Sequence, residues 1–227
     1  MFIISTEPTL IQRCKTPADI AFLLDSSAGI GAANFQKLKV FVKKIVSNFD
    51  LSPKAVRGAV VLYSNAASTR IWFDDFLDIE AFGYAINKIS YEPGGNMIDL
   101  ALENVYSNLF GPNGNSRTNV SRVAIVFTGG VQTLTPFSVT LDIASFPLKA
   151  RGVRIVVVGI GSLVDASELY LMVNNKDDLF LLKSFNTLHR SIDKLTTLLC
   201  PKGKHFLFIK SQMSLIIQTR ALHTTYS

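Results

Sequence analysis

Three short apolar stretches, each followed by polar or glycine-rich residues, are the clearest structural signals in the chain. They are residues 20–24, 123–127 and 153–158. Continuous apolar runs of this length, bounded by turn residues, are typical of parallel strands that are buried on both faces. Because the carboxyl ends of parallel strands meet at one edge of a sheet, we expect the loops that follow these strands to point the same way.

Apolar residues spaced three to four apart predict helices between the strands. The helical segments are residues 35–49 with Asn34 as the N-cap, 79–89, 99–110, a weaker one at 136–149 that contains Pro147, 165–173 and 185–199. Further strands are expected at residues 57–64, 69–73 and 179–182. The first two of these are separated by so short a link that they must form an antiparallel hairpin.

This alternation of strands and helices predicts an α/β fold with a doubly wound, mainly parallel sheet. We expect about six strands, one of them an antiparallel edge strand, with helices on both faces. The domain should span residues 17–200, a comfortable size for a single core. Residues 1–16 form an N-terminal extension, and residues 201–227 form a C-terminal tail in which we expect poor order.

The composition agrees with a packed domain, because 48% of the 227 residues are hydrophobic and only 18% are charged. The net charge of +6 favours acidic partners over long distances. Four lysines lie on one predicted helix, at positions 37, 39, 43 and 44, and are interpreted as its solvated face, so nucleic acid is not an expected partner. No transmembrane segment and no signal peptide are expected. The sequence is therefore interpreted as a fragment of a larger gene product.

Two sequence features bear on the cellular compartment. Cys14 and Cys200 bracket the domain and are either bridged, which implies an oxidising compartment, or two separate buried thiols. The polar loop at residues 111–119 ends in the sequon Asn119-Val120-Ser121, which is a glycosylation acceptor only in a secreted chain.

Enzymatic chemistry finds little support. The three histidines, His189, His205 and His223, lie in or beyond the last helix, away from the strand-end loops. A Rossmann-type nucleotide-binding enzyme is a remote alternative, because Gly29-Ile30-Gly31 follows a strand and precedes a helix. However, Asn34 occupies the third glycine position, and Asp25 would place a carboxylate beside a bound pyrophosphate.

Three motifs together resemble the von Willebrand factor type A family, which includes integrin inserted domains, matrilins and type VI collagen. The motifs are Asp25-Ser26-Ser27-Ala28-Gly29, Tyr91-Glu92-Pro93-Gly94-Gly95-Asn96 and residues 149–161, and the resemblance extends from Cys14 to Cys200. It implies a Rossmann-like fold, a disulfide between these two cysteines, and a secreted, non-catalytic adhesion domain. The implied partners are matrix proteins such as collagens, together with anionic glycans.

The family carries a metal-ion-dependent adhesion site at five positions, matched here by Asp25, Ser27, Gly29, Asn96 and Gly129. Two of the matches are glycines, so Asp25, Ser27 and Asn96 remain as a vestigial site. This set is poor for Mg²⁺, which prefers several oxygen ligands in an octahedron. We therefore expect no cofactor, or weak Mg²⁺ binding at most.

Other roles are open for the same residues. Asp25 and Ser27 can instead steady the loop by accepting hydrogen bonds from backbone amides. Asp99 can partly replace the lost charge, but its position at a helix start favours an interaction with the helix dipole or a capping role. A metal-dependent adhesion domain is the principal alternative to cation-independent binding.

Overall fold

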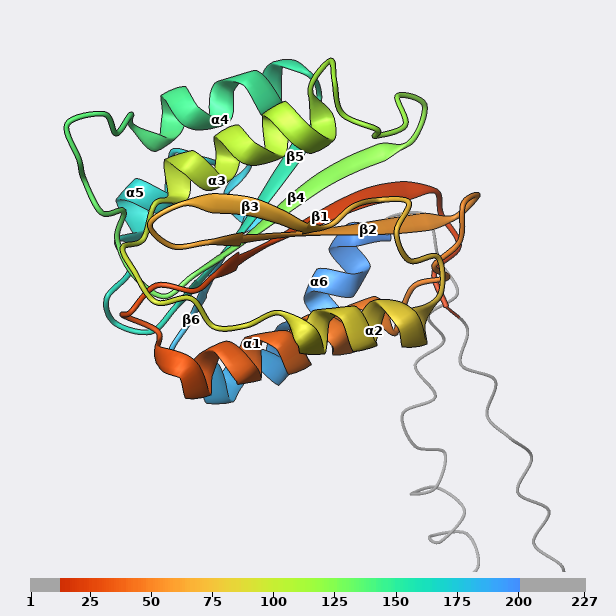
Figure 1. Ribbon diagram of the computed structural model, residues 1–227, viewed down its shortest axis with the longest axis horizontal. Helices are drawn as coiled ribbons and strands as arrows, with labels where there is room; N and C mark the ends of the chain where they lie inside the picture. Colours follow the sequence, from red (N-terminus) through yellow and green to blue (C-terminus); the bar gives the residue numbers. More distant parts are fainter. Residues whose placement is uncertain (1–12, 201–227) are drawn as a thin grey trace, which may run out of the picture.

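The computed structural model describes residues 13–200, which form a six-stranded sheet between two layers of helices (Figure 1). The strand order is β3-β2-β1-β4-β5-β6. The strands are β1 (Ala18–Asp25), β2 (Val56–Tyr63), β3 (Ala67–Ile71), β4 (Ser121–Thr128), β5 (Arg154–Ile160) and β6 (Leu179–Leu182). Every pair is parallel except β2 with β3, which confirms the predicted doubly wound sheet with one antiparallel edge strand.

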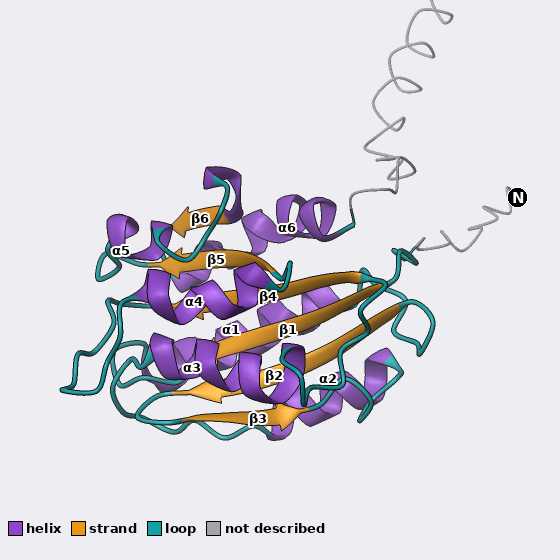
Figure 2. Cartoon of the chain, turned by 90° about the horizontal axis from the view of Figure 1, so that it is seen from above, coloured by secondary structure: helices purple, strands orange, loops and turns teal. Residues whose placement is uncertain are grey.

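Helices cover both faces of the sheet, and the view from above shows one layer in front of it (Figure 2). One layer contains α1 (Gly31–Val46), α2 (Ile79–Lys88) and α6 (Ile192–Leu199), and the other contains α3 (Ile98–Val105), α4 (Leu141–Ala150) and α5 (Ala166–Tyr170). Short helical segments complete the chain, namely η1 (Tyr106–Phe110), η2 (Lys176–Asp178) and η3 (Phe185–Ser191).

The central strands are apolar at successive positions because both of their faces are covered. Along β1, Phe22 and Leu24 join the core under α1, α2 and α6, whereas Ala21 and Leu23 join the core under α3 and α4. All eight residues of β1 are buried. The alternation of side chains across a strand thus divides one apolar run between two cores.

The predicted N-cap of the first helix is wrong. Helix α1 begins at Gly31, with Ile30 in the cap position, and the Asn34 side chain donates to the Ile30 carbonyl at 2.9 Å. The apolar spacing starts only at Phe35, because the first turn of the helix is largely exposed to solvent and carries no core residue. Gly31 has a φ of 72°, a left-handed conformation that glycine adopts at little cost.

Other boundaries differ where helical spacing continued into irregular structure. Helix α4 begins at Leu141 rather than at 136, and Pro147 lies inside it without ending it. The carbonyl that Pro147 leaves without an amide partner belongs to Ile143, which is exposed and can bind water. The segment predicted at 185–199 divides into the 3₁₀ helix η3 and α6, and the one at 99–110 ends in the π-helix η1.

A disulfide joins Cys14 to Cys200, whose Cα atoms are 6.2 Å apart, so the two ends of the domain are covalently linked. The backbone of Cys14 also forms an isolated parallel β-bridge with the backbone of Phe49. The predictions for residues 1–12 and for the tail at 201–227 lie outside the described residues. Within residues 13–200, no helix is long and apolar enough to cross a bilayer.

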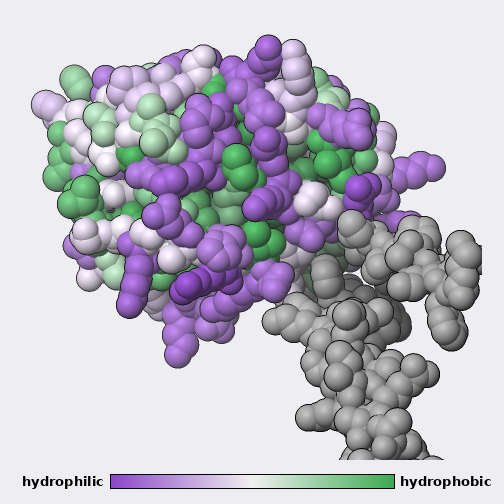
Figure 3. Space-filling model, turned by 90° about the horizontal axis from the view of Figure 1, so that it is seen from below, coloured by the Kyte–Doolittle hydropathy of each residue, from purple (hydrophilic) through white to green (hydrophobic). Residues whose placement is uncertain are grey.

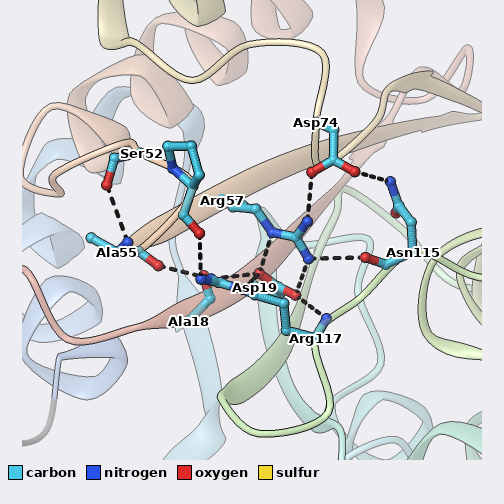
Figure 4. A network of polar contacts seen from close by, with 9 residues as sticks. Ala18, Asp19, Ser52, Ala55, Arg57, Asp74, Asn115 and Arg117 are labelled. Carbon is cyan, nitrogen blue, oxygen red and sulfur yellow. Dashed lines mark hydrogen bonds and ion pairs between the residues drawn. The ribbon is translucent and has the colours of Figure 1, made fainter.

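A buried ionic network closes the amino ends of β1 and β2 (Figure 4). The Asp19 carboxylate is fully buried and accepts from the guanidinium groups of Arg57, at 2.6 and 2.9 Å, and Arg117, at 2.8 and 3.0 Å. Arg57 also donates to Asp74 at 2.6 Å and to the Asn115 carbonyl at 2.9 Å. The network attaches the polar loop at 111–119 to the sheet.

Candidate functional site

The candidate site is the rim, defined as the loops at 25–31, 91–97, 128–140 and 160–163 around the carboxyl ends of β1, β4 and β5. Asp25, the last residue of β1, lies at its centre with 1% of its surface exposed. One carboxylate oxygen accepts from the Ser27 amide at 2.7 Å, and the other accepts from the Gly129 amide at 2.8 Å. Burial raises the pKa of Asp25, although these hydrogen bonds oppose the shift.

Asn96 joins the turn before α3 to the loop after β4. Its Nδ2 donates to Thr128 Oγ1, the Gly130 carbonyl and the Val131 carbonyl, each at 3.0 Å. Its Oδ1 is buried and has no hydrogen-bond partner. Turning the amide over would place its oxygen against two carbonyl oxygens, so these two carbonyls fix the orientation. Asp25, Ser27, Asn96 and Gly129 are therefore brought together at one place.

Several contacts that steady the rim had no signal in the sequence. The hydroxyl of Ser26 accepts from the Glu92 amide at 2.7 Å, and the Ala28 amide donates to the Gly94 carbonyl at 2.8 Å. The Tyr91 hydroxyl donates to the Ser27 carbonyl at 3.1 Å. These bonds join the loop after β1 to the turn before α3, so the loops of the rim are connected by hydrogen bonds.

The residues at the five metal-site positions do not match the ligand shell that Mg²⁺ requires. Gly29 and Gly129 supply no side-chain oxygen, and a Cβ atom added to Gly129 would collide with the Ile30 side chain. The carboxylate of Asp25 already accepts a backbone amide at each oxygen. Within residues 13–200, no group of three or more His, Cys, Asp or Glu side chains is arranged to hold a metal.

Asp99 stabilises the start of α3 and a neighbouring loop. One of its oxygens accepts from the Leu100 amide at 2.9 Å, and the other accepts from the Val139 amide at 3.1 Å. Asp99 is 4% exposed and sits in the first turn of the helix, where a negative charge is favourable. Met97 occupies the N-cap position, so Asp99 does not cap the helix, and its place in the first turn agrees with the helix-dipole role.

The loop at 129–140 presents apolar side chains to solvent at the rim. Leu134 is 77% exposed and Phe137 is 93% exposed, while Leu163 on the next loop is 64% exposed. The loop is held from below, because the Gln132 amide donates to Glu168 at 3.1 Å and the Gln132 side chain donates to the Val139 carbonyl at 2.9 Å. Sequence reasoning missed this surface because part of the loop was interpreted as a helix.

A cavity of about 350 Å³ opens beside the rim, between the start of α1 and the loops that follow β5 and β6. Its lining includes Gly29, Gly129, Gly161, Ser162, Lys183 and Phe185.

Far from the rim, Asn119 is exposed in the turn before β4, and its glycosylation remains a prediction.

The family model of the von Willebrand factor type A (VWA) domain matches residues 19–194. The chain belongs to this family. Matrilin-2 of Mus musculus is 30% identical to the domain over 196 residues, which are 83% of this chain and 20% of matrilin-2. The collagen alpha-6(VI) chain of Homo sapiens is 30% identical over 194 residues, which are 83% of this chain and 8% of that collagen. The VWA chain thus spans only a small part of these curated relatives.

The VWA fold is also found in a solved relative. Proximal thread matrix protein 1 from the mussel byssus superposes with a TM-score of 0.75 at 29% identity, over 83% of this chain and 47% of the mussel chain. Another structure of the mussel protein is described as having zinc in its metal-ion-dependent adhesion site (MIDAS) motif. The family resemblance inferred from the three sequence motifs is therefore confirmed.

Proposed function

We propose that this VWA domain is a non-catalytic interaction domain of a secreted extracellular matrix or adhesion protein. Its partners are matrix proteins such as collagens, bound at the rim without a divalent cation. Relatives among matrilins and collagens support the matrix assignment. The Cys14–Cys200 disulfide supports an oxidising compartment.

The observation that carries the proposal is the composition of the rim. The rim loops carry exposed apolar side chains at positions 134, 137 and 163, and at the base of the rim the buried Asp25 carboxylate accepts hydrogen bonds from backbone amides. Clustered exposed apolar residues mark interaction surfaces. Phe137 is suited to an anchoring role, because aromatic residues contribute much of the energy at protein interfaces.

The rim is also preorganised, which favours binding without an ion. Asp99, Gln132 and Glu168 hold the loop at 129–140 by hydrogen bonds at its base. A loop that is already ordered loses less conformational entropy when a partner binds. These hydrogen bonds support binding at the rim without a cation.

Replacing Leu134 and Phe137 together by serine should weaken binding to immobilised collagens at least tenfold in buffer that contains EDTA. A tenfold change corresponds to about 1.4 kcal/mol, a modest loss for two anchoring side chains. The control is Ile143→Ser with Phe146→Ser, because these side chains on α4 are 59% and 67% exposed but lie outside the rim loops. Binding that requires Mg²⁺, or that falls equally in both variants, would contradict the proposal.

A metal-dependent adhesion domain is the second candidate, and one observation favours it. The buried Oδ1 of Asn96 has no partner, and an unpaired buried acceptor is the type of atom that a cation can satisfy. The zinc-occupied motif of the mussel relative shows that a similar domain can hold an ion. The two candidates differ in whether an added cation stabilises the domain.

A further inference from the structure

A groove of about 520 Å³ lies between α1 and α2, on the face of the molecule turned toward the viewer in Figure 3. Its lining includes the apolar residues Val40, Val46, Ile79, Phe82 and Tyr84. Val40 is 46% exposed and Tyr84 is 64% exposed, whereas Phe82 is fully buried and forms part of the floor. The groove belongs to a helical face and does not include the rim residues.

The two helices that form the groove are fixed to each other by lysines of α1. The Lys39 side chain is 3% exposed, and its Nζ donates to the Asn87 carbonyl at 3.0 Å and to the Ile89 carbonyl at 2.8 Å. Lys43 Nζ donates to Asn87 Oδ1 at 2.8 Å. These bonds hold α1 against the carboxyl end of α2, so the groove is already formed before any partner arrives.

Positive charge surrounds the apolar floor. Lys43 and Lys44 line the groove, and Lys88 Nζ lies 5.0 Å from the centre of the Tyr84 ring. Within residues 13–200, neither these three lysines nor Lys39 forms an ion pair with a carboxylate. Glu80 is the acidic residue in the lining. A surface with unpaired cations around an apolar floor is complementary to a ligand with carboxylates around apolar groups.

We propose that the α1–α2 groove binds an acidic amphipathic segment of a partner protein. The apolar side chains of the segment lie on Val40, Ile79 and Tyr84, and its carboxylates pair with Lys43, Lys44 and Lys88. The chemistry favours a peptide over a sulfated glycan, because the exposed apolar surface of Val40 and Ile79 can be covered by the apolar side chains of a peptide, which a sulfated glycan lacks. This second surface is independent of the rim and of the function proposed for it.

The experiment is a selection of random 16-residue peptides displayed on phage against the immobilised domain. The enriched peptides should be acidic, with apolar residues at helical spacing. In fluorescence anisotropy with labelled peptides, Lys43→Gln with Lys44→Gln should weaken binding at least tenfold, and Val40→Asp should do the same. The control is Lys54→Gln with Lys176→Gln, which removes the same charge from exposed positions outside the groove and should change affinity less than twofold.

Any of four results would overturn the proposal. The selection could enrich no peptide, the enriched peptides could be neutral or basic, or the lysine variant could bind them as tightly as the unmodified domain. A heparin dodecasaccharide that needs Lys43 and Lys44 but binds Val40→Asp normally would assign the groove to glycans instead. The rim variant with serine at 134 and 137 should bind the selected peptides normally, so this test and that of the rim can fail separately.

Discussion

Replacing Asp19 by alanine should lower the free energy of unfolding by about 3–5 kcal/mol, measured by urea titration. The change leaves Arg57 buried without its principal counterion, because Asp19 accepts two of its guanidinium hydrogen bonds. It also releases Arg117, which binds Asp19 through its guanidinium group and its backbone amide. An unpaired buried charge costs more than the lost attraction alone.

The matched control is Glu103→Ala, which removes one carboxylate from an exposed position of α3 and should change stability by at most about 0.5 kcal/mol. If Asp19→Ala were equally mild, the network in Figure 4 would not be a source of stability.

The same network predicts a pH dependence. Burial would raise the pKa of Asp19, but hydrogen bonds from Arg57 and Arg117 outweigh it and hold the pKa below 3.8. A lowered folded-state pKa gives stability that is present above 3.8 and is lost as the pH falls through the lowered value. The stability difference between the unmodified domain and Asp19→Ala should therefore narrow in acid.

Removing the disulfide by changing Cys14 and Cys200 to serine should cost about 2–5 kcal/mol. The bridge closes a loop with a sequence separation of 186 residues, so it restricts the unfolded chain strongly. Urea titration of the oxidised domain, the reduced domain and the double serine variant is the appropriate measurement. The reduced domain and the variant should unfold at the same, lower urea concentration. Equal midpoints for all three proteins would show that the bridge contributes nothing.

The architecture was predictable because the parallel strands are buried on both faces and read as uninterrupted apolar runs. Residues 20–24 illustrate this, since the apolar run stops just before Asp25, where the strand also ends. Helix starts were harder, because the exposed first turn of α1 contributes no apolar residue to the pattern. The segment at 136–140 was misassigned because Phe137 and Val139 look like core residues but are exposed.

At the rim, motif matching selected the right neighbourhood but not the contacts. It named Asp25, Ser27 and Asn96, which lie together. It did not predict the hydrogen bonds of Tyr91, Thr128 and Gln132 that define the loops. Such contacts join residues far apart in the chain and have no local pattern. The collision of a Gly129 side chain with Ile30 likewise depends on packing. Restoring a carboxylate at 129 therefore also requires a smaller residue at 30.

The most direct test of cation-independent function is the unfolding free energy of the unmodified domain in EDTA, in millimolar Mg²⁺ and in Zn²⁺. A site with a micromolar dissociation constant would add roughly 4 kcal/mol to the free energy of unfolding at a millimolar cation concentration, because the ion binds only the folded state. Our account predicts no resolvable difference, since Asp25 is engaged by the amides of Ser27 and Gly129. A rise of several kcal/mol that Asp25→Ala abolishes would contradict it and establish the metal-dependent alternative.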